Sequence, residues 1–400
     1  MLSHYDCPVS SYRTITKSSL FTIFCVLMEL AGCLTLAAQD NRFVVFESGR
    51  HGYINQEGVL VIPTNLQGTY VLHFSEGLVS FPEWERVKPE PATVPYVDKD
   101  GKLRLFRQEK WGFIDTSGTV VIGAQFDAVA EFSQGLAAVA TDTDRTDHSC
   151  IDCDRNQLWG FIDKSGKKVI PLQYRAVLSF SEGLAAVMND EGKWGYVNTN
   201  GELIIPFTFE SIRSFSEGLA PVAVNKQFGY IDKQGRLVIQ PQYAMAGDFS
   251  EGLAAVRTGG KAVFMILGPA GETWTFIGKD GKKRLDLPKK TEQVRAFAEG
   301  LAVIEVDGRC GYVNTSGVIA ISPAFSYCGD FSEHLADVLN NGKWRYIDKQ
   351  AKVVLEVPYD EVRSFRNGLA AVQEGLSGPE QKFGYIDQHG KQVWKPKPSL

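Results

Sequence analysis

The stretch from Phe180 to Ser214 reads FSEGLAAVMNDEGKWGYVNTNGELIIPFTFESIRS, and the same order of residues starts again at Phe215. Its opening Phe-x-x-Gly-Leu, or a close variant, recurs at spacings of 58, 48, 35, 34, 48, 34 and 34 residues, at Phe74, Phe132, Phe180, Phe215, Phe249, Phe297, Phe331 and Phe365. A fixed period with occasional surplus is typical of a tandem repeat in which each unit packs on its neighbours. The chain is therefore expected to be a repeat array.

Each repeat alternates short apolar runs with turn residues. In the unit quoted above, residues 184–188, 194–198 and 203–206 are apolar or alternating runs, and Asn, Asp and Gly residues separate them. Such runs predict strands joined by hairpins, and no window shows the 3.6-residue period of a helix. We expect each unit to be a three-stranded antiparallel meander.

The middle strand of the meander is the most regular part. Seven of its nine copies carry Gly, Tyr or Phe, Ile or Val, and Asp or Asn in this order, and the two copies at Thr275 and Arg345 are degenerate. A tryptophan precedes five of them, and the resulting structural positions include Trp111, Gly112, Trp159, Gly160, Trp194, Gly195, Trp274 and Trp344. In a strand, the Trp and Tyr lie on one face and the Gly and Ile on the other. A glycine there predicts that another backbone or ring approaches closely.

This Trp-Gly pattern resembles the WG-repeat (KWG) family of bacterial proteins over about residues 43–396. The resemblance implies an extracytoplasmic β-repeat array with no catalytic residues. Nine three-stranded units leave no surplus strand at either end to complete a shared sheet. We therefore predict an all-β fold of about nine meander repeats in an open, twisting solenoid, with a closed, propeller-like ring as the alternative.

The residues before the array differ in character. An apolar run at 20–28 follows Arg13 and Lys17 and is too short to span a bilayer as a mature helix. Leu-Ala-Gly-Cys at 30–33 resembles a bacterial lipobox, which implies that Cys33 is lipidated. We assign 1–32 to a lipoprotein-type signal peptide, 33–41 to a short linker and 42–398 to the array. Cleavage after Ala37 or Ala38, giving a secreted protein, is the alternative.

Three surplus segments, at 80–110, 141–158 and 258–272, all fall between the first and second strand of a meander, which predicts that they lie along one rim. The second contains His148, Cys150 and Cys153. In an exported protein these cysteines favour a local disulfide or free thiols, and a metal site is the weaker interpretation. Cys310 and Cys328 are a second pair that could form a disulfide.

No catalytic motif appears, and the glutamate of Phe-x-x-Gly-Leu is interpreted as capping a turn. A formal net charge of −5 offers no basic surface for nucleic acid. We predict a non-catalytic binding or scaffold protein of the bacterial cell envelope, without a cofactor, attached to the membrane through its lipid anchor and recognising a protein or an envelope polymer. Carbohydrate or cell-wall binding through the serial tryptophans is the alternative, and an enzyme is a weaker one.

Overall fold

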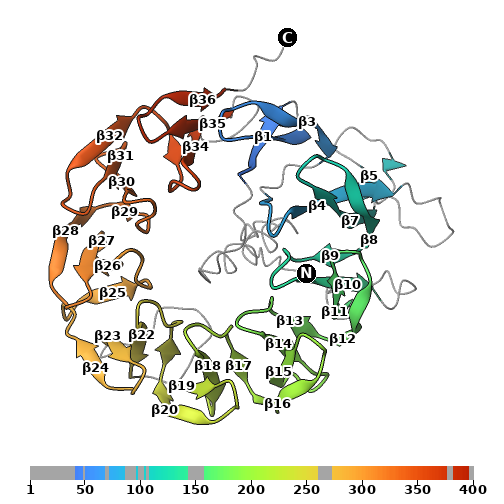
Figure 1. Cartoon of the computed structure of the whole chain (residues 1–400). Coiled ribbons are helices and arrows are strands. Elements are labelled where there is room, and N and C mark those ends of the chain that lie inside the picture. The colour runs from blue at the N-terminus through green and yellow to red at the C-terminus, as the bar shows by residue number, and fades with distance from the viewer. Residues whose placement is uncertain are drawn as a thin grey trace, which may run out of the picture. The chain divides into compact units, whose positions relative to one another are not determined.

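The computed structural model describes residues 41–47, 50–67, 72–85, 96–97, 103–104, 108–142, 157–259, 273–375 and 382–395, which form strands and turns. The strands make nine small antiparallel sheets, called blades 1 to 9 in chain order, which are arranged in a ring (Figure 1). No helix in the described part of the chain could span a membrane. The prediction of about nine antiparallel repeats in an all-β fold is confirmed.

In the part of the chain that the structure describes, blades 1 and 2 have three strands each, which correspond to the second, third and fourth strands of the other blades and are counted as such below. Blade 1 contains β1 (Phe43–Glu47), β2 (Arg50–Ile54) and β3 (Leu60–Gln67). Blade 2 contains β4 (Leu78–Glu85), β7 (Gln108–Asp115) and β8 (Val120–Phe126). Between β4 and β7, β5 (Tyr96–Val97) and β6 (Leu103–Arg104) pair as a separate hairpin.

Blades 3 to 9 have four strands each, and the first is short. Their strands are, in chain order, β9 (Ala128–Val129), β10 (Leu136–Asp142), β11 (Gln157–Asp163) and β12 (Lys168–Tyr174); β13 (Ala176–Val177), β14 (Leu184–Met188), β15 (Trp194–Asn198) and β16 (Leu203–Phe209); β17 (Ser211–Ile212), β18 (Leu219–Val224), β19 (Gln227–Asp232) and β20 (Leu237–Tyr243); β21 (Met245–Ala246), β22 (Leu253–Thr258), β23 (Thr273–Gly278) and β24 (Lys283–Leu285); β25 (Thr291–Val294), β26 (Leu301–Val306), β27 (Arg309–Asn314) and β28 (Ile319–Phe325); β29 (Tyr327–Cys328), β30 (Ala336–Asn340), β31 (Lys343–Ile347) and β32 (Val353–Val357); β33 (Glu361–Val362), β34 (Leu369–Glu374), β35 (Lys382–Asp387) and β36 (Gln392–Trp394).

The short first strand is the part of each blade that the sequence did not predict. It lies between one meander and the next, where two residues pair with the following strand, as Ala176 and Val177 pair with Met188 and Val187; in blade 7 three residues pair in this way. First strands such as β13 lie toward the centre of the ring, and fourth strands such as β16 lie at its circumference (Figure 1). The second to fourth strands are the predicted meander.

The glycine in the third strand is required by the path of the fourth. The register between β15 and β16 shifts on both sides of Tyr196, which brings the Ile205 carbonyl against Gly195. A Cβ on Gly195 would lie 2.5 Å from that oxygen, and a Cβ on Gly160 would lie 2.5 Å from the Ile170 oxygen. The close approach expected from the sequence is therefore that of the neighbouring strand's own backbone.

Successive blades are joined by a repeated aromatic contact. The ring of Tyr196 in blade 4 lies 4.8 Å from that of Phe215 in blade 5, and its hydroxyl donates a 2.6 Å hydrogen bond to the Arg213 carbonyl. Phe161 and Phe180 make the same ring contact between blades 3 and 4 at 4.8 Å. The Phe of Phe-x-x-Gly-Leu is thus the residue that docks each blade on the preceding one.

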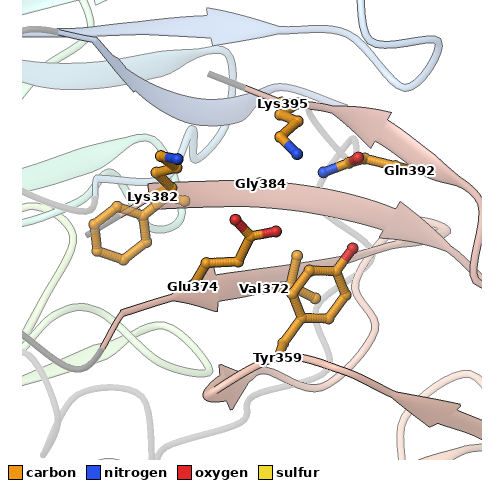
Figure 2. Close-up of a pocket in the computed structure, with 8 residues that line it drawn as sticks. Tyr359, Val372, Glu374, Lys382, Gly384, Gln392 and Lys395 are labelled. Atoms are coloured by element: carbon orange, nitrogen blue, oxygen red, sulfur yellow. The ribbon is translucent and has the colours of Figure 1, made fainter. Parts of the chain in front are cut away.

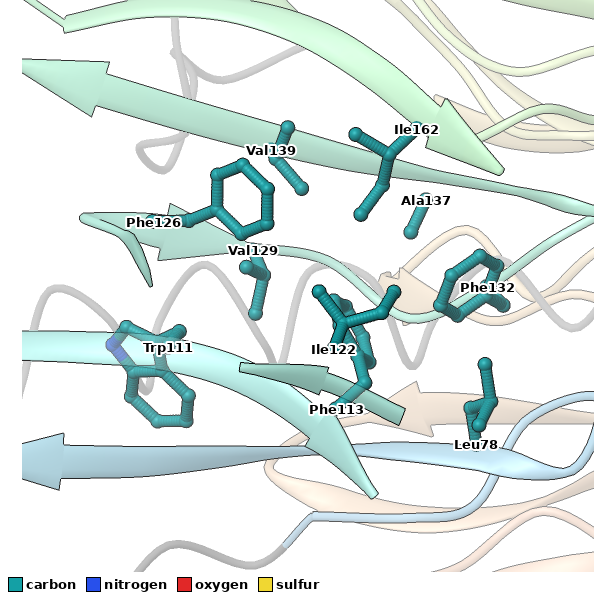
Figure 3. Packing of buried hydrophobic residues seen from close by; sticks show 10 residues of the cluster. All are labelled: Leu78, Trp111, Phe113, Ile122, Phe126, Val129, Phe132, Ala137, Val139 and Ile162. Carbon is teal, nitrogen blue, oxygen red and sulfur yellow. The ribbon is translucent and has the colours of Figure 1, made fainter. Parts of the chain in front are cut away.

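A separate hydrophobic cluster fills each space between blades. The cluster between blades 2 and 3 includes Trp111, Phe113 and Ile122 from blade 2 and Phe132 and Ile162 from blade 3 (Figure 3). Corresponding clusters lie at the other blade contacts. Burial of apolar side chains therefore occurs between blades, as the repeat pattern predicted.

Blade 9 packs against blade 1 and closes the ring. Phe43 contacts Tyr385 with ring centroids 5.4 Å apart, and the Tyr385 hydroxyl donates to the Val44 carbonyl at 2.9 Å. Gln56 donates to the Asn367 carbonyl at 2.9 Å across the same contact. The sequence favoured an open solenoid, but the observed form is the alternative, a closed, propeller-like ring. Among the described residues, side chains bridge the two end blades and no strand is shared between them.

The two faces of the ring carry different connections, because antiparallel strands alternate in direction. The first, here called the turn face, carries the Ser-Glu-Gly-Leu turns between first and second strands and the turns between third and fourth strands. The second, here called the link face, carries the hairpins between second and third strands and the links from each fourth strand to the next blade.

The predicted division of the chain into signal peptide, linker and array falls partly on residues that the structure does not describe. Residues 1–32 and most of the linker at 33–41 are outside the described residues, as are 86–95, 143–156 and 260–272 within the three surplus segments. The strands that flank the surplus segments are β4 and β7, β10 and β11, and β22 and β23, which are the second and third strands of their blades. All three segments therefore start and end on the link face.

We expect Gly195→Ala to destabilise the ring, because the added methyl group would press on the Ile205 carbonyl. The cost should be about 1–3 kcal/mol, as for other overpacked interiors. Gly123→Ala is the matched control, since a Cβ at Gly123 in β8 meets no atom within 4 Å. Urea denaturation followed by circular dichroism measures both. Equal stability of the two variants would contradict this explanation of the glycine.

Candidate functional site

The serial tryptophans lie between blades. Trp111 and Trp344 are 4% and 8% exposed, and Trp159, Trp194 and Trp274 are partly buried. The Trp344 indole donates at 2.9 Å to the carbonyl of Asp360, in the link to blade 9, and the Trp274 indole donates at 3.0 Å to the carbonyl of Glu292, in β25 of blade 7. These side chains are therefore used mainly in packing, as are Gly112, Gly160 and Gly195.

Several candidate residues lie outside the described residues: Cys33, His148, Cys150 and Cys153. Their predicted lipidation, disulfide or metal binding remain predictions. Within the part of the chain that the structure describes, no three His, Cys, Asp or Glu residues form a group that could hold a metal ion.

Cys310 and Cys328 form a disulfide, with Cα atoms 6.0 Å apart. Cys310 lies in β27 of blade 7, at the position that tryptophan occupies in other blades, and Cys328 lies in β29 of blade 8. The bond therefore joins two neighbouring blades covalently, at a contact that elsewhere depends on an aromatic ring.

The glutamates of the Phe-x-x-Gly-Leu segments connect blades on the turn face. Glu182 and Gly183 have φ of 52° and 89°, which form the two-residue turn between Ser181 and Leu184. The Glu182 carboxylate accepts a 3.0 Å bond from the Gly218 amide of the next blade and pairs with Lys233 at 3.0 Å. The predicted capping role is therefore exerted on the neighbouring blade's turn.

The same contact recurs around the ring. The corresponding pairs of acceptor and amide are Glu76 and Gly135, Gln134 and Gly183, Glu217 and Gly252, Glu251 and Gly300, Glu299 and His334, and Glu333 and Gly368. Burial opposes ionisation of Glu299, but bonds from Lys349 and the His334 amide hold its pKa below the ordinary value. His334 replaces the glycine yet keeps the bond, at a φ of 72°.

Blade 8 departs most clearly from the pattern at Asp337. The equivalent position in the second strand of blades 3, 4, 6 and 9 is alanine, and Asp337 is 1% exposed. Ser364 donates a 2.6 Å hydrogen bond to its carboxyl group. Burial raises the pKa of Asp337, and the nearby Asp330 adds to this effect. An acid at an alanine position was the available signal in the sequence, and sequence reasoning missed it.

Arg295, Tyr327 and Asp330 lie close to this buried acid at the inner wall of blades 7 and 8. The Arg295 guanidinium is 3.4 Å from the Asp330 carboxylate and 5.8 Å from the centroid of the Tyr327 ring. Tyr327 is 38% exposed and packs edge-on against Trp344, with centroids 5.3 Å apart. Burial raises the pKa of Asp330, and Arg295 opposes that shift. We call these three residues with Asp337 the Arg295 cluster.

A pocket adjoins the Arg295 cluster. It has a volume of about 100 Å³. It is lined by residues that include Gln293, Arg295, Glu305, Tyr327 and the two disulfide-bonded cysteines, Cys310 and Cys328. Most of these residues belong to or adjoin the first and second strands of blades 7 and 8, near the link face and the inner wall of the ring, and Cys310 lies in the third strand of blade 7. The pocket combines a cation, an acid, an amide and an exposed aromatic ring, which suits recognition of a group with both polar and planar parts.

A second pocket lies in blade 9, and Figure 2 shows Glu374, Lys382, Gln392 and Lys395 around it. Its volume is about 10 Å³, room for no more than one water molecule. The pocket beside the Arg295 cluster is therefore the better candidate of these two for a ligand.

The model of the family described as "WG containing repeat" matches residues 111–142, 159–194, 194–227, 228–261, 311–344 and 344–375, together half of the chain. No curated protein matches the sequence.

Several solved structures are similar in fold. A eukaryotic initiation factor aligns with a TM-score of 0.59 at 10% identity, covering 89% of this chain and 95% of that one. BamB from Moraxella catarrhalis has a TM-score of 0.39 at 9% identity, covering 84% and 94%. AztD from Citrobacter koseri has a TM-score of 0.39 at 12% identity, covering 89% and 93%. At these identities the likeness concerns the fold alone.

We expect the disulfide to stabilise the contact between blades 7 and 8. For a bond that closes 18 residues, the stabilisation should be about 3 kcal/mol. The double variant C310A/C328A should unfold at lower urea concentration than the oxidised protein, and dithiothreitol should lower only the latter's stability. Peptide mapping without reductant should recover the Cys310–Cys328 peptide. An equally stable variant, or a different pairing, would contradict this prediction.

Proposed function

The chain belongs to the WG-containing repeat family, and we propose that it is a non-catalytic binding or scaffold protein of the bacterial cell envelope. Its ligand engages the link face and the inner wall at blades 7 and 8, where the Arg295 cluster lies. The lipidated Cys33 holds the protein in the envelope in this proposal.

One observation carries the proposal: the repeated side chains are used between blades, whereas Tyr327, the buried Asp337 and the Cys310–Cys328 disulfide depart from the repeat at one place. The Tyr196–Phe215 contact and the Glu182–Gly218 bond exemplify the repeated use. By contrast, Arg295, Tyr327 and Asp330 lie beside a pocket of about 100 Å³. A rigid repeat scaffold that presents non-repeated side chains is the arrangement by which such arrays recognise partners.

The ligand chemistry follows from the pocket. Tyr327 offers a partly exposed ring, and Arg295 above it offers a cation that Asp330 only partly neutralises. Aromatic and arginine side chains are those most often found at the centre of protein interfaces. We therefore favour an envelope protein as the partner. Asp337 is 1% exposed, so it supports the cluster from within and no ligand reaches it.

Binding of a carbohydrate is the second candidate, and Tyr327 is the residue that favours it. The tryptophans lie between blades, but an exposed tyrosine ring can stack on a sugar. Because Tyr327 packs on Trp344, a sugar bound there should change tryptophan fluorescence. A saturable change in tryptophan fluorescence on titration with peptidoglycan fragments, absent in Tyr327→Ala, would indicate that the ligand is a glycan and not a protein.

The proposal predicts that the full chain captures a partner from solubilised envelopes through the Arg295 cluster. The variant R295A/Y327A should lose at least tenfold of the captured partner, because both contact groups are removed. The matched control is R213A/M245A, which changes the equivalent positions at blades 5 and 6, where Arg213 pairs with Asp248 at 2.9 Å. Quantitative mass spectrometry of the captured material measures the loss.

Two results would contradict the proposal. Equal loss in R295A/Y327A and R213A/M245A would show that the Arg295 cluster has no special role. Absence of the native chain from the envelope fraction of its own cells would contradict the location.

A further inference from the structure

Apolar side chains are exposed at the start of the fourth strand in six blades. They lie at the outer edge of the ring, directly after the turns of the turn face. These rim residues and their exposed fractions are Val59 57%, Leu60 40%, Val120 55%, Val121 42%, Leu203 46%, Ile204 41%, Leu237 40%, Val238 45%, Val318 60%, Ile319 42%, Val353 46% and Val354 43%. Single exposed apolar residues are ordinary, but a set repeated on one face of the ring indicates an interaction surface.

Basic residues alternate with the rim residues at the same strand starts. In two of the three blades where the apolar pair is missing, a lysine stands at its first position, Lys168 in blade 3 and Lys283 in blade 6, and blade 9 has Gln392 there. The position just before carries an exposed acid in blade 4, Glu202, and exposed basic side chains in five other blades: Lys167, Arg236, Lys282, Lys352 and Lys391. Arg236 is paired with Asp232 at 2.7 Å, so part of this charge is neutralised within the turn. A mixture of aliphatic and basic side chains is the composition that binds the interface of an anionic lipid layer.

The chain also enters the ring from the turn face. Asn41 donates to Gln56 at 3.5 Å, and Arg42 donates to the Thr116 carbonyl at 3.3 Å. Gln56 and Thr116 both lie in turns between third and fourth strands. Seven residues separate Asn41 from Cys33, and eight peptide steps span at most about 29 Å. The segment that would carry a lipid on Cys33 therefore joins the ring at this face.

We propose that the turn face lies on an anionic lipid surface, with the rim residues in the interface and the link face directed away from it. The inference rests on the envelope location in the proposed function and names the surface that the protein contacts there. It leaves the pocket beside the Arg295 cluster open to a partner, because that pocket adjoins the link face.

The test uses residues 41–400, whose nine hydrophobic clusters all lie between Phe43 and Trp394, so that the ring is complete without the leader. Flotation with vesicles of equal parts phosphatidylglycerol and phosphatidylcholine measures binding. We expect at least fivefold more binding than to pure phosphatidylcholine, and a decrease as salt is raised.

The variant L203E/L237E/I319E should lose at least tenfold of this binding, because three charges replace apolar contacts. The matched control T208E/Q242E/A324E adds the same three charges to exposed positions of the same strands, five residues further on and near the link face. It should bind within twofold of the native ring. Circular dichroism confirms that both variants fold.

Equal loss in both variants, or no vesicle binding by the native ring, would overturn the inference. A dimer in analytical ultracentrifugation that dissociates in L203E/L237E/I319E and not in the control variant would also overturn the inference, because the rim would then be covered by a second copy. These results would not affect the proposed envelope location, because that location is tested separately by cell fractionation. Vesicle binding by a chain that is absent from envelope fractions would contradict the proposed function alone.

Discussion

Contact between blades is the interaction on which the rest of the structure depends. A sheet of three short strands buries too little apolar surface to offset the entropy lost when its residues become ordered. The docking of Phe215 on Tyr196 supplies the missing burial, and its equivalents do so around the ring. The glycine of the third strand serves the same end, because it lets the fourth strand pack closely enough to complete each blade.

Polar groups reinforce these contacts and fix their geometry. The Tyr196 hydroxyl bonds to the Arg213 carbonyl, and the Glu182 carboxylate bonds to the Gly218 amide. The first lies inside the blade contact and the second on the turn face, so neighbouring blades are held at two levels. Residues used in this way are not available to a ligand. Function is therefore expected at departures from the repeat such as Tyr327, and at the outer edge of the ring.

The local structure could be predicted from the sequence, because apolar runs, turn glycines and the Trp-Gly motif are all signals of short range. Ring closure could not be predicted, because it depends on the small rotation between neighbouring blades, and the sequence of a single repeat does not determine that rotation. The reach of Glu182 to the next blade and the pairing of Ala176 with Met188 were missed for the same reason: each joins residues that the sequence repeat, counted from Phe180, places in different units. Asp337 could have been noticed as an acid at an alanine position, but its neighbours Arg295 and Ser364 come from different blades.

Hydrogen exchange of the native protein tests the closed ring most directly. In a closed ring every blade has two neighbours, so amides of β2 and β35 in the end blades should be protected as strongly as those of β15 in blade 4. In an open array the end blades have one neighbour each and fray first. Comparable protection is the predicted result. Exchange of β2 and β35 at least a hundredfold faster than that of β15 would contradict the account.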